Sequence, residues 1–344
     1  SWSNIEVLEI ANQAAAPVLL ENFNLGKVLG TGGFGKVFLA EHKETRRLCA
    51  IKALKKEDIV DKGNFESVLK EKKILEKITS VKDPFLVSLH ESFQTENHLF
   101  FVMEYLPGGD LFDLSEAIGQ LEEPQVRFYA ACVVLGLEAL HRIGIVHRDL
   151  KLENLMLDKD GYVKIVDFGL SKDRFGFGQR TQTQCGTIPY MAPEIFLGNG
   201  YGMAVDWWAL GIIIYILLTD ELPFENEDMN ELIRSILYYE PPLPAELSMF
   251  VRNLIGELLK KDPESRLGFG HFGAERVKEH AFFSFIEWDA VLNRSMRPPF
   301  LLDNQGHLES LKDPECQALT LTPPARKIPS EMQEEFREFD YTAD

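Results

Sequence analysis

The segment GTGGFGKV at residues 30–37 limits the fold of this chain more than any other stretch. Its glycines have the spacing G-x-G-x-x-G, which occurs in the turn of a dinucleotide-binding βαβ unit and in a hairpin that covers nucleotide phosphates. The first design needs a helix directly after the third glycine and an acidic residue about 20 positions later. Here the strand-like KVFLAEH comes next, and AIK with Lys52 stands near the later position. The sequence therefore favours a glycine-rich β-hairpin, with an ordinary glycine hairpin as the alternative.

Short apolar runs around this hairpin predict a small β-sheet. We expect three antiparallel strands between Phe23 and Leu54, and two more from FLVSLHESF and HLFFVMEYL, which end near Leu106. Between these groups, residues 64–78 repeat their apolar positions at helical spacing. The first part of the chain therefore predicts a sheet with one long helix.

Helices dominate after PGGD. One begins at Pro124, a position that helices accept in their first turn. The longest apolar run, at 207–218, is shorter than the ~20 residues that span a bilayer, so we expect a buried helix and no transmembrane segment. Prolines interrupt the chain after about residue 290. The expected fold is α+β and bilobal, with a linker at 1–22, a β-rich N-lobe at 23–106, a helical C-lobe at 107–285 and an extended tail at 286–344.

Charge and cysteine usage narrow the functional classes. The 36 basic and 54 acidic residues give a net charge of −18. This balance disfavours nucleic acid and anionic membranes as partners and mildly favours basic ones, although it also fits a charge that only aids solubility. The four cysteines are far apart and form no C-x-x-C, so we expect reduced thiols and a cytoplasmic protein.

The stretch HRDLKLEN carries three polar residues with complementary chemistry. Asp149 can accept a hydroxyl proton, Lys151 can neutralise a phosphoryl group, and Asn154 offers an oxygen to Mg²⁺. Asp167 follows the strand-like VKIV and opens DFG, where a carboxylate can bind Mg²⁺ beside nucleotide phosphates. APE closes the loop that DFG opens. The order of these motifs makes chance a poor explanation.

Glu71 lies on the apolar face of the helix expected over 64–78. A carboxylate on such a face needs a partner, because an unpaired buried charge is costly. Lys52 is one candidate partner. The alternative is a solvated glutamate paired with Lys70 or Lys72 of the same helix.

These motifs identify the chain as a member of the eukaryotic protein kinases, which it resembles from about Phe23 onward. The glycine-rich loop, AIK, HRDLKLEN, DFG, APE and the pair Asp206 and Arg266 stand where that family places them. Lys151 resembles serine/threonine rather than tyrosine kinases. TQTQCGT, RPPF and FREFDY are similar to the AGC group. FVMEYLPGGDL, ACVVLGL, GYVKIVDFGL and LTPP most resemble protein kinase N, the PKC-related kinases.

The resemblance implies that residues 23–285 are a catalytic domain that binds Mg·ATP and that 286–344 are an AGC-type tail. Lys52, positioned by Glu71, would hold the α- and β-phosphates. The other ATP-binding positions, in the glycine-rich loop, around the adenine ring and at the hinge, would be Leu29, Gly30, Thr31, Gly32, Gly33, Phe34, Gly35, Val37, Ala50, Met103, Glu104, Leu106 and Met156.

The resemblance also assigns the transfer step. Asp149 would orient the substrate hydroxyl and take its proton, and Lys151 would neutralise the transferred group. Asn154 and Asp167 would hold magnesium ions. The implied activity is transfer of the ATP γ-phosphate to serine or threonine. A pseudokinase or scaffold that binds ATP without transfer is the second functional class, and the presence of all these residues counts against it.

Regulatory positions are implied by the same resemblance. Thr183 would be an activation-loop phosphosite for an upstream kinase, and its phosphate could draw Arg148 and Lys172 together; an ordinary polar threonine is the alternative. Thr322 resembles a turn-motif phosphosite. A hydrophobic motif, in which an aspartate replaces the usual phosphorylatable residue, would dock on the N-lobe through Phe336, Phe339, Asp340 and Tyr341.

The chain departs from its relatives at substrate-facing positions. Asp110 and Glu153 remain to receive a substrate Arg or Lys, so we expect protein substrates with basic residues near the acceptor. Ile216 and Pro189 stand where basophilic members often have glutamate, and His147 replaces a common tyrosine. HLESLKD also lacks the tail aromatic that reaches the nucleotide in relatives. We expect a cytoplasmic monomer, with nuclear or peripheral-membrane recruitment left to regions outside this chain.

Overall fold

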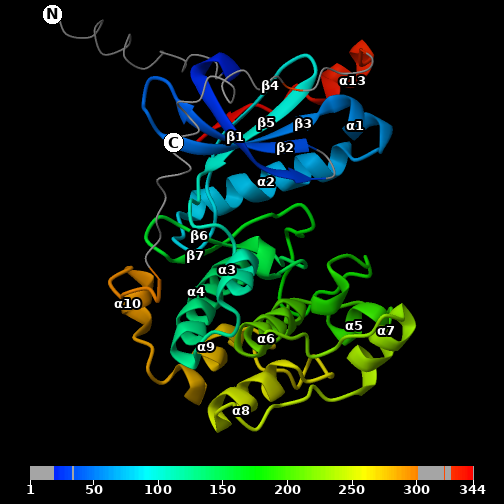
Figure 1. The fold of residues 1–344 in the computed structure, drawn as a ribbon. Coiled ribbons are helices and arrows are strands. Elements are labelled where there is room, and N and C mark those ends of the chain that lie inside the picture. Colours follow the sequence, from blue (N-terminus) through cyan, green and yellow to red (C-terminus); the bar gives the residue numbers. More distant parts are fainter. Residues whose placement is uncertain (1–18, 33–34, 301–320, 322–326, 344) are drawn as a thin grey trace, which may run out of the picture.

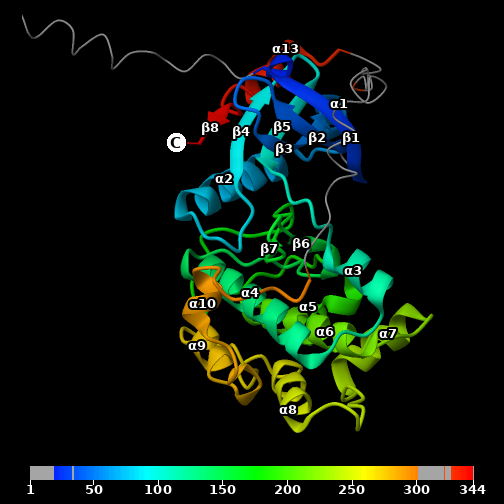
Figure 2. The same cartoon turned by 60° about the vertical axis from the view of Figure 1, so that its left-hand side comes forward.

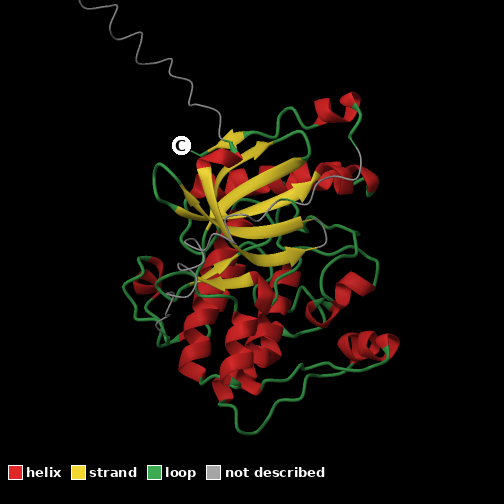
Figure 3. Ribbon diagram, turned by 45° about the horizontal axis from the view of Figure 1, so that its top comes forward, coloured by secondary structure: helices red, strands yellow, loops and turns green. Residues whose placement is uncertain are grey.

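The computed structural model describes residues 19–32, 35–300, 321 and 327–343. Two lobes are visible in Figure 1, with most strands in the upper lobe and most helices in the lower lobe. The same division is clear in Figure 3, where strands and helices are coloured separately. The predicted α+β bilobal fold is confirmed.

The N-lobe is built on a six-stranded antiparallel sheet with the order β1-β2-β3-β5-β4-β8. Gly35 begins the second strand, and a Cβ there would lie 1.9 Å from the carbonyl oxygen of Ala53, so only glycine fits. The three predicted strands before Leu54 and the long helix are confirmed. The elements are β1 (Phe23–Gly32), β2 (Gly35–His42), β3 (Leu48–Lys55), α1 (Lys56–Asp61), α2 (Phe65–Val81), β4 (Leu89–Gln94), β5 (His98–Glu104), α13 (Ser330–Glu335) and β8 (Tyr341–Thr342).

The prediction of a strand across all of FLVSLHESF is wrong for its first half. Asp83 accepts a hydrogen bond from the backbone N–H of Phe85 at 2.9 Å and turns the chain there. Residues 85–87 then pair with Ile165 of the C-lobe, through Ile165 N to Phe85 O and Val87 N to Ile165 O. The strand β4 begins only at Leu89. This short stretch therefore joins the two lobes instead of extending the sheet.

Helices form the C-lobe around α6, in which every residue except Ile216 is buried. This confirms the buried helix predicted from the long apolar run. Within the described part of the chain, no helix combines the length and apolarity needed to cross a membrane. The remaining elements are α3 (Leu111–Ile118), α4 (Glu123–Arg142), β6 (Leu155–Leu157), β7 (Val163–Ile165), α5 (Pro193–Phe196), α6 (Ala204–Thr219), α7 (Met229–Tyr238), α8 (Met249–Leu258), α9 (Gly273–Lys278) and α10 (Trp288–Leu292).

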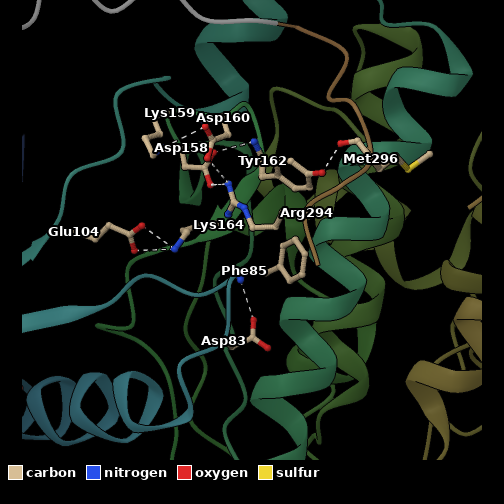
Figure 4. A network of polar contacts seen from close by, with 10 residues as sticks. All are labelled: Asp83, Phe85, Glu104, Asp158, Lys159, Asp160, Tyr162, Lys164, Arg294 and Met296. Carbon is tan, nitrogen blue, oxygen red and sulfur yellow. Dashed lines mark hydrogen bonds and ion pairs between the residues drawn. The ribbon is translucent and has the colours of Figure 1, made fainter. Parts of the chain in front are cut away.

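The stretch after α10 returns to the turn between β6 and β7, as Figure 4 shows. The guanidinium of Arg294 contacts Asp158 at 2.5 Å and lies over the ring of Tyr162, 4.5 Å from its centroid. The hydroxyl of Tyr162 donates to the carbonyl of Met296. This clamp fixes the start of the tail to the C-lobe.

The end of the described chain packs on the N-lobe. Figure 2 shows β8 beside β4, with α13 above the sheet. The side chains of Phe336 and Phe339 are 1% and 0% exposed. Their rings lie 5.0 Å from Phe65 of α2 and 5.1 Å from Phe101 of β5, respectively. Both the sheet and the long helix of the N-lobe therefore contact the tail.

Candidate active site

The strand register brings several predicted nucleotide-binding residues onto one face of the N-lobe sheet. Val37 of β2 pairs with Lys52 of β3, and Ala50 of β3 pairs with Met103 of β5. Directly opposed residues in antiparallel strands project to the same face, as do residues two apart in one strand. Val37, Ala50, Lys52 and Met103 therefore share a face. Leu29, Gly30, Thr31 and Gly32 lie in β1, and Gly35 opens β2.

Lys52 reaches from this face to α2. Its Nζ lies 2.6 Å from Oε1 of Glu71, whose side chain is 10% exposed. Burial by itself lowers the pKa of Lys52, but the carboxylates of Glu71 and Asp167 outweigh burial and raise it. Lys52 is therefore a permanent cation. The alternative partners of Glu71 are used elsewhere, because Lys72 pairs with Glu76 at 2.7 Å and Lys70 lies near Glu66.

The hinge is fixed by an ion pair between the lobes. Glu104 ends β5, and its two carboxylate oxygens lie 2.7 and 2.8 Å from Nζ of Lys164 on β7 (Figure 4). Leu106 comes two residues later and is buried, whereas Met156 of β6 is partly exposed. Met156 forms a β-bridge with Asp110, just after the hinge. The Lys164 contact was not anticipated from the sequence.

Asp149 accepts hydrogen bonds from the activation segment, the stretch from DFG at 167–169 to APE at 192–194. Its Oδ1 accepts from both the backbone N–H and the hydroxyl of Thr187, at 2.9 and 2.8 Å. Asn154 donates to the carbonyl of Asp149 at 2.8 Å, and Nζ of Lys151 lies 3.9 Å from Oδ2. Thr187 thus occupies Oδ1, whereas Oδ2 has longer contacts, with the amide nitrogen of Asn154 at 3.5 Å and Nζ of Lys151 at 3.9 Å.

Asp206 of α6 anchors the loop that carries Asp149. It accepts from the backbone N–H groups of His147 and Arg148, both at 2.9 Å, and contacts Nε2 of His141 at 2.8 Å. Burial alone raises the pKa of the Asp206 carboxyl, but these hydrogen bonds and the two histidines lower it overall. The carboxylate is therefore ionised and fully used as an acceptor. A second buried pair, Arg266 with Glu194 at 2.6 and 2.8 Å, ties the APE segment to the C-lobe.

Asn154 and Asp167 suit a magnesium ion. The amide nitrogen of Asn154 is used by Asp149, which leaves its amide oxygen for a cation. The Asp167 side chain is exposed, and its φ of 58° turns the backbone sharply after β7. One amide and one carboxylate oxygen match the preference of Mg²⁺ for a few hard ligands that nucleotide phosphates complete. Within the part of the chain that the structure describes, no group of three or more His, Cys, Asp and Glu could hold a metal without the nucleotide.

Phe168 directly succeeds Asp167 and packs on the catalytic loop. Its ring lies 5.2 Å from that of His147, which also contacts the carbonyl of Val166 at 3.0 Å. Leu75 of α2 and Leu86 are buried in the same core. This apolar contact holds the DFG segment in place while the Asp167 side chain stays exposed.

The activation segment passes close to the catalytic loop. Thr183 is exposed, and its carbonyl accepts a hydrogen bond of 2.5 Å from the hydroxyl of Tyr201. Lys172 and Arg148 are the two cations expected to approach a phosphate at Thr183. Nζ of Lys172 donates to Oγ1 of Thr181 at 2.9 Å, and Nη1 of Arg148 lies 3.5 Å from the Tyr201 hydroxyl. Tyr201 was not identified from the sequence, where nothing separates it from an ordinary core tyrosine.

The predicted substrate-binding carboxylates lie on neighbouring elements. Asp110 caps α3 by accepting from Asp113 N at 2.8 Å, and Glu153 is exposed in the catalytic loop. Burial raises the pKa of the Asp110 carboxyl, and the charges of Asp113 and Glu153 add to the rise. The two carboxylates therefore lie close enough to influence each other.

The predicted hydrophobic motif lies on the N-lobe. Ser92 donates to the carbonyl of Phe339 at 2.6 Å, and Gln94 donates to the carbonyl of Phe336 at 2.7 Å. Asp340 lies 3.5 Å from Gln94, and the ring of Tyr341 lies 6.0 Å from Nζ of Lys72. The predictions for Gly33, Phe34, Thr322 and the HLESLKD segment fall outside the described residues.

Comparisons with known proteins agree with this architecture. Residues 23–283 match the protein kinase domain. Serine/threonine-protein kinase N2 of Danio rerio is 45% identical over 341 residues, which are 98% of this chain and 35% of that protein. Protein kinase C of Aspergillus fumigatus is 44% identical over 94% of this chain and 30% of its own length. RAC-beta serine/threonine-protein kinase of Rattus norvegicus is 41% identical over 99% of this chain and 72% of its own length.

The chain therefore spans about a third of the length of the first two relatives. These relatives confirm the predicted resemblance to the AGC group and to protein kinase N. With the kinase motifs in order, the pairing of Lys52 with Glu71 and the matched domain, this chain belongs to the protein kinase family.

Proposed function

We propose that this chain transfers the γ-phosphate of ATP to serine and threonine hydroxyls of proteins. The observation that carries the proposal is the 2.6 Å ion pair of Lys52 with Glu71, with Asp167 close enough to raise the pKa of the same lysine. One cation is thus shared by the helix α2 and the segment that would bind magnesium. This is the arrangement that aligns nucleotide phosphates for transfer.

ATP would lie against the sheet face of Val37, Ala50 and Met103, with backbone groups of Glu104 and Leu106 at the adenine edge. Lys52 would contact the α- and β-phosphates. Asn154 and Asp167 would hold Mg²⁺, which when bound neutralises charge on the phosphates. The chain's own part in this step is alignment, because the transition state of phosphoryl transfer is largely dissociative.

Asp149 would accept the proton of the substrate hydroxyl through Oδ2, because Thr187 already binds Oδ1. Lys151, 3.9 Å from Oδ2, would lie beside the transferred group and offset its charge. The bond from the γ-phosphorus to the bridging oxygen of ADP would break as the bond to the substrate oxygen forms, so ADP would be the leaving group. The proton would then pass from Asp149 to solvent. The anchoring of this loop by Asp206 keeps the base in place through the cycle.

Specificity and regulation complete the proposal. Asp110 and Glu153 would bind a substrate Arg or Lys, and an upstream kinase would phosphorylate Thr183. Thr322 would be a second phosphosite, and the chain would act as a cytoplasmic monomer. The catalytic domain would comprise residues 23–285, and the tail would comprise residues 286–344. ATP binding without transfer is the alternative, and no feature of the described site favours it.

Transfer of labelled γ-phosphate from Mg·ATP to a serine peptide with basic residues tests the proposal. An Asp149→Asn variant serves as the control, with ATP binding measured on both proteins. We expect transfer by the unchanged chain and a loss of about 100-fold or more in the variant, with ATP binding retained. ATP binding without transfer by a chain phosphorylated at Thr183 would instead identify a scaffold. If peptides without basic residues were phosphorylated equally well, the predicted role of Asp110 and Glu153 would be wrong.

A further inference from the structure

Tyr201 contacts the activation segment at two points, Thr181 and Thr183. It lies just before α6 and is 2% exposed. Its backbone exchanges two hydrogen bonds of 2.9 Å with Thr181. Its hydroxyl donates to the carbonyl of Thr183 at 2.5 Å. Two residues of the segment are thereby held by a single buried tyrosine.

The same hydroxyl faces the catalytic loop. Nη1 of Arg148 lies 3.5 Å from the Tyr201 oxygen, at the outer limit of a hydrogen bond. The Sγ of Cys185 lies 3.7 Å from it. Arg148 is itself fixed, because its backbone N–H donates to Asp206 and its Nε donates to the carbonyl of Leu170 at 2.7 Å. The hydroxyl therefore lies between a hydrogen-bonded arginine and the backbone of the segment.

The hydroxyl keeps its proton at neutral pH. Burial raises the pKa of Tyr201 to about 12, although the nearby Arg148 acts in the opposite direction. A protonated hydroxyl can donate to the Thr183 carbonyl and accept from Arg148 simultaneously. The hydroxyl is thus uncharged, and its contacts do not involve the Thr183 side chain, which is exposed.

We infer that Tyr201 is a positioning residue that holds the activation segment against the catalytic loop when Thr183 carries no phosphate. Its hydroxyl joins Arg148 to the backbone of Thr183, whereas a phosphate on the Thr183 side chain would contact Arg148 directly. The inference rests on the proposed kinase function. Its consequence for catalysis runs through Thr187, four residues further on, which holds Oδ1 of Asp149.

The chain offers a matched control for this hydroxyl. Tyr129 of α4 is also buried, and its hydroxyl has no hydrogen-bond partner among the described residues. Tyr201→Phe and Tyr129→Phe therefore remove the same atom from buried rings, but only the first breaks a hydrogen bond. A loss seen with both variants reports general destabilisation.

The test compares the two variants on the full chain in two backgrounds, Thr183→Ala and fully phosphorylated Thr183 verified by mass spectrometry. In the Thr183→Ala background, Tyr201→Phe is expected to lower kcat about tenfold with the KM for ATP within twofold. In the phosphorylated background the loss is expected to be under twofold, because phosphate then bridges to Arg148. Tyr129→Phe should change neither.

Equal losses in both backgrounds would overturn the inference, since they would mark Tyr201 as a purely structural residue. No loss in either background would overturn it as well. Hydrogen exchange of the amides at 181–187 supplies a readout that needs no phosphotransfer. We expect faster exchange in Tyr201→Phe than in Tyr129→Phe when Thr183 is unmodified, and unchanged exchange would contradict the inference even if the kinase proposal failed.

Discussion

Both carboxylate oxygens of Glu104 contact Nζ of Lys164, at 2.7 and 2.8 Å, and this ion pair joins the last residue of β5 to β7. The Lys164 side chain is 9% exposed. Breaking one side of a buried pair leaves the other charge without compensation. The backbone of Glu104 is also the proposed adenine contact, so the pair should affect nucleotide binding.

Lys164→Met is expected to raise the KM for ATP about three- to tenfold while kcat changes less than twofold. Steady-state kinetics at varied ATP concentration measures both. Lys159→Met is the control, since Lys159 is on the adjoining turn and its side chain is 79% exposed. An unchanged KM in Lys164→Met would show that the pair does not hold the adenine site.

Lys56 gives the tail contact a pH dependence. Its ammonium lies 4.9 Å from the centroid of the Phe336 ring and donates to Gln94 and Gln333. Burial lowers its pKa to about 8, although Asp340 and Glu96 act in the opposite direction. Between pH 8 and about 10 the unfolded chain keeps the proton that the folded chain has lost, so the free energy of unfolding rises with pH.

Denaturant midpoints at pH 7.5 and 9.5 should therefore differ more in the unchanged chain than in Lys56→Met. The expected change is an increase in the stability of the unchanged chain relative to the variant at the higher pH. Parallel curves for the two proteins would mean that Lys56 does not titrate in this range.

Thr187 sets the orientation of the catalytic carboxylate. Its hydroxyl donates to Oδ1 of Asp149 at 2.8 Å. A hydrogen bond to a charged acceptor contributes about 1.5–3 kcal/mol, so Thr187→Val should lower kcat by about 10- to 100-fold. Thr187→Ser keeps the donor and should retain most activity. Single-turnover rates with saturating Mg·ATP separate this effect from binding, and equal rates in Val and Ser variants would contradict it.

The tail aromatics should stabilise the N-lobe. Replacing a buried Phe by Ala typically costs about 3–5 kcal/mol, and Phe336→Ala with Phe339→Ala removes both anchors. We expect a lower Tm and lower activity, because Phe336 packs on α2, the helix of Glu71. Met332→Ala, on the exposed side of α13, is the control. If the double variant matched the control in Tm and activity, the docking would have no functional weight.

Much of the site could be predicted from local chemistry. Lys52, Asp149 and Asp167 stand in motifs whose spacing itself limits the fold, and the glycine-rich hairpin was separable from a dinucleotide turn by the strand directly after it. Glu71 could be placed on an apolar face, but periodicity alone could not choose Lys52 over its neighbours on α2. The choice depends on how α2 packs against β3, which is a property of the tertiary structure.

Other residues carry no local signal. Tyr201 and Lys164 are ordinary residues in their own segments, and their partners, Thr183 and Glu104, lie 18 and 60 residues away along the chain. The two-residue strand β8 is too short to have a detectable alternation, so its place in the sheet could not be predicted from FREFDY and the last residues of the chain. The prediction of a sheet strand at 85–87 was wrong for a related reason, because β propensity does not indicate which strand is the partner.

The position of β8 has a consequence for synthesis. Ser92 of β4 bonds to Phe339, 247 residues later in the chain. The ribosome therefore makes five strands of the N-lobe sheet long before it makes the sixth. During that interval β4 is an edge strand with unpaired backbone groups. Such an edge can pair with another chain, and β8 prevents this once it lies beside β4. β8 thus covers the edge of a sheet whose other strands precede the whole C-lobe in the chain.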